Sequence, residues 1–416
     1  MSTPATPTLP TVGSRYIGLM VLAQFGVFLA FITPVGISLS IRVGELAPGH
    51  EEYLGYITGV GGLVPLVAGP LLGALSDRTR TRFGRRRPFI LGGMLLGVVS
   101  LLVMALAPNI PVLGLGWVLA QFGWGQSFGN LLTSQADRLP EEQRGKVAGL
   151  GGFATLVAPV IGVVMAGGLA GDALLLFLVP GAVGVLTIVL FVWLVDEADS
   201  RDLPAAEPLT VRSLLAMYTW SVRKYRDFSL NWAGRFAFYF GLTLNTTFTA
   251  FFFASRLGVK VEEVAGTLAA VAGLGVLATA AGAMGGGFLS DRLRRRRVFV
   301  LTAGAVYALG TVTMALSSSV PPLFTGSIIC SVGLGMFSAV DQALALDVLP
   351  ERETNAGRYL GVFGFATSIP QSAAPFIAPL FLTAGGAEKN YTLLYLVAAA
   401  CTLMGGLVVL RIKSVR

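Results

Sequence analysis

Two ionisable side chains, Arg235 and Asp341, lie inside otherwise apolar stretches of the chain. An ionisable group is costly in hydrocarbon, so each is a candidate functional group. Arg235 lies about seven residues into its stretch, and Asp341 lies about six residues before the end of another. At 1.5 Å per helical residue, both lie roughly 10 Å from the same side of a membrane. This equal depth favours an ion pair.

A carboxylate in this position can carry a proton. We predict that Asp341 takes up and releases a coupling proton, and that Arg235 is its partner or a hydrogen-bond donor to a bound solute. The alternative is a structural ion pair that stays closed. We expect no cofactor besides the proton and no metal, because Cys330 and Cys401 lie far apart in apolar stretches.

Neutral polar side chains lie in the same kind of stretch. Amides and aromatic rings on facing helices suit a neutral polyhydroxyl ligand, which needs several donors and acceptors and a ring to lie against. The alternative for each single amide is a bond between helices. The candidates are Gln126 and Asn130, which share a helix face with Asp137, together with Gln121, Gln24, Asn231, Tyr239 and Asn245.

Arginine-rich turns follow two of the apolar stretches, at Gly73 to Pro88 and at Gly286 to Arg297, and both contain Leu-Ser-Asp-Arg. In the first turn, the Asp77 carboxylate can accept hydrogen bonds from Arg78 or Arg85 and from free amides at a nearby helix start. Such a contact would hold one side of a carrier closed in one state and break in the other. Anchoring of topology alone is the alternative. The full set of gate candidates is Asp77, Arg78, Gly84, Arg85, Arg86, Asp291, Arg292, Asp137 and Arg144.

The composition places these groups in a bilayer. Among 416 residues, 54% are hydrophobic and only 12% are charged, too few to cover a soluble protein of this size. Uncharged runs of roughly 20 residues recur, the length that a helix needs to cross about 30 Å of hydrocarbon. We predict twelve spans: Tyr16 to Ile41, Leu54 to Ala74, Phe89 to Ala107, Val112 to Ser134, Val147 to Gly168, Ala173 to Val195, Phe228 to Ala254, Ala265 to Leu289, Val298 to Ser317, Pro321 to Leu346, Tyr359 to Thr383 and Tyr391 to Leu410.

The connections between these spans alternate in charge. Nearly all arginine and lysine lies in the connections after even-numbered spans and in the termini, which predicts cytoplasmic termini by the positive-inside rule. We expect an N-terminal half (1–195), a cytoplasmic linker (196–227) and a C-terminal half (228–416). In the linker, apolar residues from Val211 to Tyr225 at helical spacing predict an amphipathic helix on the inner leaflet or a plain linker helix.

The two halves repeat one another. Asp137-Arg138-Leu139-Pro140-Glu141 is echoed by Asp347-Val348-Leu349-Pro350-Glu351, and the following glycines match as well. Such duplication is typical of secondary carriers. Gly145, Gly149 and Gly152 recur at helical spacing, which predicts close approach between helices.

The loop motif, the duplication and the topology together resemble the major facilitator superfamily. The first loop, from Leu75-Ser76-Asp77-Arg78 to Pro88-Phe89, looks closest to the sucrose and glycoside cation symporters. The resemblance implies an all-α membrane protein of twelve helices in two pseudo-symmetric six-helix halves, with spans one, four, seven and ten around a central cavity. It also implies alternating access and proton-coupled symport of a sugar or glycoside.

Three features depart from known sugar carriers. Leu132 stands where the resemblance to plant-type sucrose carriers would place an arginine, and the second span lacks the acids that sodium-coupled melibiose-type carriers use there. The run Ala158-Pro159-Val160-Ile161-Gly162 partly resembles a motif of drug antiporters. A proton-coupled exporter of drugs or small metabolites is therefore the alternative, with a non-transporting sensor as a third reading.

Other function classes fit the sequence poorly. The one histidine, His50, lies in an outer connection, and no set of nucleophile and base and no nucleotide loop is present, so we expect no enzyme. The net charge of +8 orients the chain in its membrane rather than binding nucleic acid. We expect a multi-pass monomer in the inner (plasma) membrane, in contact with the lipid bilayer and a small-molecule solute.

Overall fold

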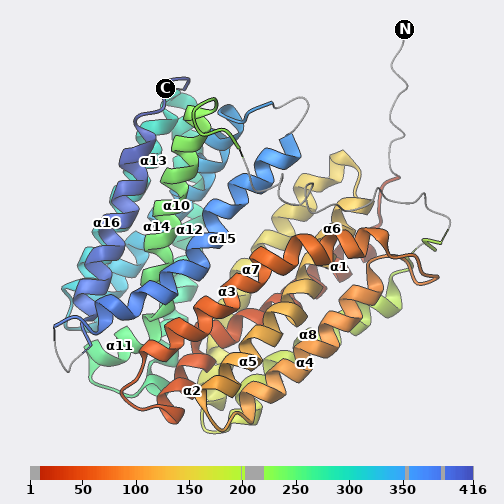
Figure 1. The fold of residues 1–416 in the computed structure, drawn as a ribbon, viewed down its shortest axis with the longest axis horizontal. Helices are drawn as coiled ribbons and strands as arrows, with labels where there is room; N and C mark the ends of the chain where they lie inside the picture. Colours follow the sequence, from red (N-terminus) through yellow and green to blue (C-terminus); the bar gives the residue numbers. More distant parts are fainter. Residues whose placement is uncertain (1–9, 198, 202–219, 352–355, 386–388, 416) are drawn as a thin grey trace. The chain divides into compact units, whose positions relative to one another are not determined.

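The computed structural model describes residues 10–197, 199–201, 220–351, 356–385 and 389–415. These residues form helices joined by short turns, with no strand among them (Figure 1). The prediction of an all-α membrane protein is confirmed. Most of the predicted amphipathic helix of the linker lies outside the described residues.

Each predicted span coincides with a helical segment. The first six segments are α1 (Ser14–Thr33) continued by η1 (Pro34–Ser38) and α2 (Leu39–Leu46), α3 (Glu52–Arg78), α4 (Arg87–Ala105), α5 (Ile110–Ala120) continued by η2 (Gln121–Gly125) and α6 (Gln126–Arg138), α7 (Glu141–Leu169) and α8 (Ala173–Leu194). The others are α10 (Arg226–Thr247) with α11 (Thr249–Leu257), η3 (Val261–Val264) with α12 (Ala265–Leu293), α13 (Arg296–Ala315), α14 (Val320–Asp347), α15 (Ala356–Leu382) and α16 (Tyr391–Val409).

Length and hydropathy support membrane crossing. Within the described part of the chain, ten helices are long and apolar enough to span a bilayer, and the bent pair α10 and α11 makes an eleventh. The remaining predicted span is the run of α5, η2 and α6. Several helices, such as α3 and α7, extend beyond the predicted spans into the polar flanks, because hydropathy marks only the part of a helix that lies in hydrocarbon.

Three spans are irregular near their middle. Pro34 has no N–H to donate to a helical hydrogen bond, and a π turn begins at this residue and covers Pro34–Ser38. A second π turn covers Gln121–Gly125, where two glycines weaken the regular ladder. α10 and α11 bend by 50° at Phe248. Such breaks free backbone groups inside the membrane and often mark functional regions.

Contacts divide the chain into two compact units. Unit 1 contains Met1–Ser38 and Val67–Glu207, and unit 2 contains Leu39–Leu66 and Pro208–Arg416. α3 thus begins among the residues of unit 2 and ends among those of unit 1. The division into halves at 1–195, 196–227 and 228–416 stays a prediction.

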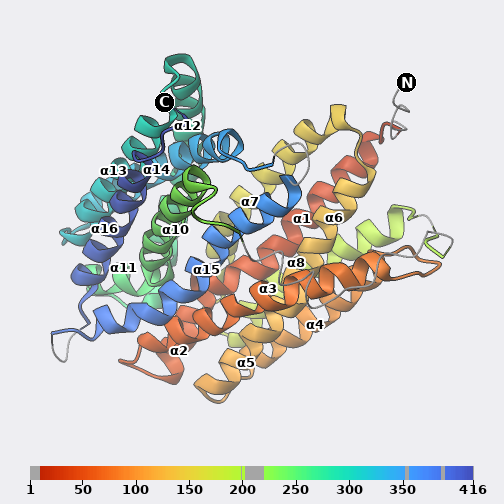
Figure 2. The ribbon, with the colours of Figure 1, turned by 45° about the horizontal axis from the view of Figure 1, so that its top comes forward.

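In unit 1, α1 packs against α7 and α8, and α4 packs against α5 and α8 (Figure 2). A Cβ added at Gly97 would lie 2.6 Å from the Trp124 ring, so only glycine allows this approach. The prediction for Gly145, Gly149 and Gly152 is wrong for this structure. A Cβ added at any of the three would meet nothing within 4 Å.

In unit 2, α14 packs against α12 and α13, and α10 packs against α15 and α16 (Figure 1). The Phe238 and Phe337 rings stack with centroids 3.6 Å apart and join α10 to α14. The first part of α3 packs on α15. A Cβ added at Gly62 would lie 2.8 Å from Ser372 Cα, and Ser372 Oγ donates to the Gly59 carbonyl at 2.8 Å.

Candidate functional site

An ion pair joins α10 to α14 inside unit 2. Arg235 Nη1 donates to Asp341 Oδ2 at 2.6 Å. The Asp341 side chain is 1% exposed and the Arg235 side chain is 15% exposed. The sequence indicated that these two charges share one depth, and the structure places them in direct contact. Their roles in proton and solute binding stay predictions.

The surroundings of the pair are aromatic and neutral. Arg235 Nε donates to Thr367 Oγ1 at 2.9 Å on α15, and the guanidinium lies 4.4 Å from the Phe363 ring and 5.2 Å from the Tyr239 ring. Ring faces attract a guanidinium, so these contacts hold it in place without adding a second negative charge. Among the residues that the structure describes, Asp341 is the one anion that bonds to Arg235.

Two buried polar groups near this pair are left without partners. Asp341 Oδ1 and both polar atoms of the Asn231 amide are buried and have no hydrogen-bond partner among the described residues. Asn231 lies one helical turn before Arg235 on α10. A buried polar atom without a partner costs about 1–3 kcal/mol. Such atoms are suited to receive a proton, water or solute.

Asn245 has a structural role in this arrangement. Its amide Nδ2 donates to Thr311 Oγ1 at 3.2 Å, and its backbone carbonyl accepts a hydrogen bond from the Tyr395 hydroxyl at 3.1 Å. Both partners lie on other helices of unit 2. Asn245 therefore bonds between helices, which is the alternative that the sequence left open for each amide.

The amides of unit 1 also bond to protein groups. Gln24 Nε2 donates to Gln135 Oε1 at 2.5 Å, joining α1 to α6. Asn130 Oδ1 accepts from Ser76 Oγ at 2.7 Å, and Asn130 Nδ2 donates to the Gln126 carbonyl at 2.9 Å. Gln121 lies in the π turn η2 and is partly exposed. Each of these hydrogen bonds joins neutral groups only.

Arg86 is the centre of the arginine loop of unit 1. Its side chain is 4% exposed and donates to Ser76 Oγ at 2.8 Å, to Asp77 Oδ1 at 2.5 Å and to Asp137 Oδ2 at 3.0 Å. Asp137 Oδ2 also contacts Arg85 at 2.9 Å. The end of α3, the start of α4 and the end of α6 thus meet at one guanidinium, which can present several donors in a fixed fork.

The other gate candidates lie around this centre. Gly84 has φ +84°, and a Cβ there would lie 2.4 Å from the Glu197 carboxyl carbon, so the turn requires glycine. Glu197 in turn accepts from the Arg86 backbone N–H at 3.2 Å. Arg78 and Arg144 donate to the backbone carbonyls of Ala74 and Leu139.

Unit 2 contains a matching cluster. Arg296 donates to Asp347 Oδ2 at 2.5 Å and contacts Asp291 Oδ1 at 3.2 Å. The sequence prediction named Asp291 and Arg292 but missed Arg296 and Asp347. The internal repeat could have identified them. In the repeat, Asp347 corresponds to Asp137 and Asp291 to Asp77, so Arg296 is the counterpart of Arg86.

Sequence comparison identifies the family. The model of the Major Facilitator Superfamily matches residues 16–284 and 232–416. The chain belongs to the major facilitator superfamily.

Named relatives in this superfamily transport solutes. The chain is 35% identical over 115 residues to a general alpha-glucoside permease of Schizosaccharomyces pombe, covering 26% of this chain and 19% of the relative. It is 43% identical over 69 residues to solute carrier family 45 member 3 of Mus musculus, covering 17% of this chain and 11% of the relative. The matches thus span about a fifth or less of these relatives.

A solved structure agrees on the fold. A mutant of the nucleoside transporter NupG aligns with a TM-score of 0.78 and 10% identity, covering 95% of this chain and 99% of that chain. The family match and the apolar helices together make the protein a multi-pass membrane transporter of the major facilitator superfamily and not an enzyme. It handles small solutes in a lipid bilayer, as the sequence predicted.

Polar contacts also join the residues around the N-terminus of α3 to those around the N-terminus of α16 in this major facilitator chain. The Tyr391 hydroxyl donates to Glu51 Oε2 at 2.9 Å, and Lys389 Nζ donates to Glu52 Oε2 at 2.5 Å. Burial raises the pKa of the Glu51 carboxyl above its ordinary value, against the opposing effects of Tyr391 and Lys389.

We expect Glu51→Gln to raise the thermal unfolding midpoint at about pH 7. The Glu51 carboxyl binds its proton more tightly in the folded protein than in the unfolded chain. Ionised Glu51 therefore lowers the free energy of unfolding at pH values above the unfolded pKa, and protonated Glu51 does not lower it at pH values below that pKa. The difference in unfolding midpoint between Glu51→Gln and the wild type should vanish near pH 3. Glu45→Gln, which removes an exposed carboxylate beside Arg42, should change little in the same assay. A lower midpoint for Glu51→Gln at pH 7 would contradict the expectation.

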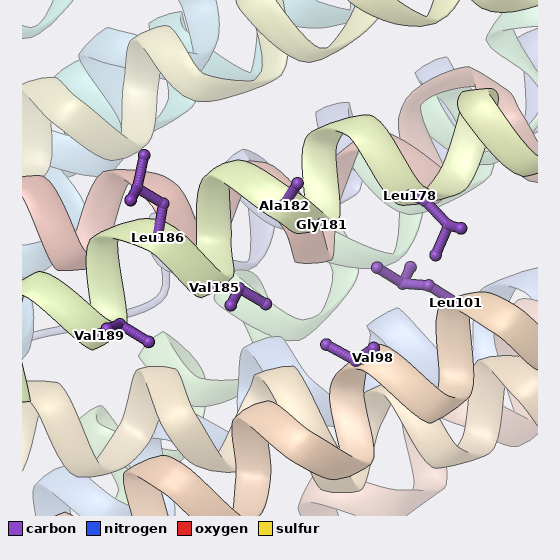
Figure 3. Close-up of a pocket in the computed structure, with 8 residues that line it drawn as sticks. All are labelled: Val98, Leu101, Leu178, Gly181, Ala182, Val185, Leu186 and Val189. Atoms are coloured by element: carbon purple, nitrogen blue, oxygen red, sulfur yellow. The ribbon is translucent and has the colours of Figure 1, made fainter.

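An apolar groove of about 500 Å³ lies between α4 and α8 (Figure 3). Leu101, Leu178 and Val185 are among its lining residues, and every lining side chain is aliphatic or absent. It offers no side-chain donor or acceptor to a polar solute.

Proposed function

We propose that the protein is a proton-coupled symporter of a neutral sugar or glycoside, with α-glucosides as the first class to test. The observation that carries the proposal is the buried Arg235–Asp341 pair with its unpartnered Asp341 Oδ1. A proton on this oxygen would neutralise the carboxyl inside the membrane. Similarity to an alpha-glucoside permease supports the sugar part.

The pair provides a route from proton binding to solute binding. When Asp341 is ionised, the guanidinium of Arg235 is balanced by the carboxylate 2.6 Å away. When Asp341 is protonated, that attraction is lost and the arginine needs another acceptor. Solute hydroxyl oxygens are suitable acceptors, so solute binds best to the protonated carrier.

The arginine clusters supply a conformational element for the same cycle. Arg86 and Arg296 each join two aspartates from different helices, at corresponding positions of the repeat. Contacts that form in one state and break in the other are what alternating access requires. By the positive-inside rule, these clusters and both termini face the cytoplasm of a plasma membrane, and the carrier works as a monomer.

Uptake into proteoliposomes tests the proposal. The purified protein is reconstituted with an inside pH one unit above the outside pH, and labelled maltose, sucrose and glucose are added. One-to-one coupling predicts about tenfold accumulation of the preferred sugar, because one pH unit corresponds to about 1.4 kcal/mol. A sodium gradient should give none. Absence of sugar accumulation, together with proton-driven efflux of a drug panel, would replace symport by export.

A further inference from the structure

Polar side chains that the pair does not use are exposed in the membrane-spanning part of unit 2. Gln371 lies near the middle of α15, Ser338 lies in the C-terminal half of α14, and both side chains are exposed. An amide that faces hydrocarbon leaves its donors and acceptors unsatisfied, at a cost of roughly 2 kcal/mol or more. The exposed amide of Gln371 is therefore better satisfied beside a polar pathway than beside lipid.

The contacts of α10 with α15 fix the level of Gln371. Trp232 Nε1 donates to the Val362 carbonyl, and three residues later Arg235 Nε donates to Thr367 Oγ1. The two helices thus run in the same direction. One helical turn beyond Arg235 and Thr367, on the same faces, lie Tyr239 and Gln371.

The contacts of α10 with α14 bring Ser338 to the same level. α14 runs in the opposite direction, because Arg235 pairs with Asp341 while the later Phe238 and Tyr239 contact the earlier Phe337, the residue next to Ser338. Unit 2 therefore holds two successive layers of polar groups. The first contains the charged pair, and the second contains a phenol, a hydroxyl and an amide with no charge.

We propose that Tyr239, Ser338 and Gln371 form a binding subsite for the hydroxyl groups of a neutral pyranose ring. The amide offers donors and an acceptor for neighbouring hydroxyls, and the phenol ring offers a flat face for the apolar side of the sugar. Asp341 Oδ1, buried and without a partner, lies in the adjoining layer. This inference rests on the proposed sugar transport and specifies which residues recognise the sugar.

The test uses Gln371→Leu, which replaces an exposed amide by an apolar group of similar size. We expect the KM for the transported sugar to rise at least tenfold, with an unchanged ratio of protons to sugar. Gln371→Asn should show an intermediate KM. The matched control is Thr302→Val on α13, an exposed hydroxyl that bonds only to its own helix and should leave KM unchanged.

Deoxy sugars separate recognition from indirect effects. Wild-type protein should lose affinity for at least one analogue that lacks a single hydroxyl, and Gln371→Leu should no longer distinguish that analogue from the parent sugar. An unchanged KM in Gln371→Leu, or undiminished discrimination, would overturn the subsite while sugar transport by the wild type stands. Failure of the wild type to transport any sugar would overturn the proposed function and the subsite together.

Discussion

Asp341→Asn is expected to abolish accumulation of solute against its gradient while leaving exchange of solute across the membrane intact. Asparagine has nearly the shape of the protonated acid and cannot release a proton. The variant should therefore bind and reorient with solute, but pH should no longer drive it. Accumulation should fall from about tenfold per pH unit to equality of inside and outside concentrations.

Counterflow and pH-driven uptake in the same proteoliposomes measure the two activities. Asp341→Asn leaves Arg235 without its carboxylate, so thermal unfolding must confirm a folded protein. Asp341→Glu keeps a titratable group and should retain some accumulation. Full pH-driven accumulation by Asp341→Asn would show that the ion pair is structural and that the proton binds elsewhere.

Arg86→Ala is expected to cause the largest loss of stability among the loop arginines. The substitution removes donors to Ser76, Asp77 and Asp137 from a side chain that is almost fully buried. We expect the free energy of unfolding to fall by about 3 kcal/mol, because partly buried carboxylates lose their partner. Transport should fall with it, since the ends of three helices lose their common contact.

Two neighbouring arginines provide graded controls. Arg85 makes one contact with Asp137, so Arg85→Ala should have a smaller effect. Arg82 is exposed and stacks on the Phe83 ring, so Arg82→Ala should change the unfolding midpoint little. Equal midpoints for all three variants, measured by thermal unfolding in detergent, would contradict the central position of Arg86.

Hydrophobicity alone was enough to predict the helices, and the loop motif and the duplication were needed as well to predict the family. Uncharged runs of span length recur along the chain, and the bilayer leaves few other structures for them, so each predicted span coincides with a helical segment. The common depth of Arg235 and Asp341 followed from counting residues along two helices. In this respect the sequence was sufficient because helix geometry converts position into depth.

Contacts between helices were harder to predict, since they depend on the rotation of each helix about its axis. Asp77 bonds to Arg86, which lies two residues after the turn at Gly84, and the sequence alone did not single out this arginine. Gly145 suggested close packing that its helix face does not make. The sequence did not identify Ser338 and Gln371 as candidate site residues, because neutral polar residues in spans serve helix packing as often as ligand binding.

Direct measurement of proton entry tests the central claim of proton-coupled sugar uptake. Proteoliposomes loaded with a fluorescent pH indicator start at equal pH inside and outside, with the membrane potential clamped to zero, and an α-glucoside is added outside. We predict acidification of the interior in proportion to labelled sugar entry, one proton per sugar, and no acidification with Asp341→Asn. Sugar entry without acidification in the wild type would contradict the account.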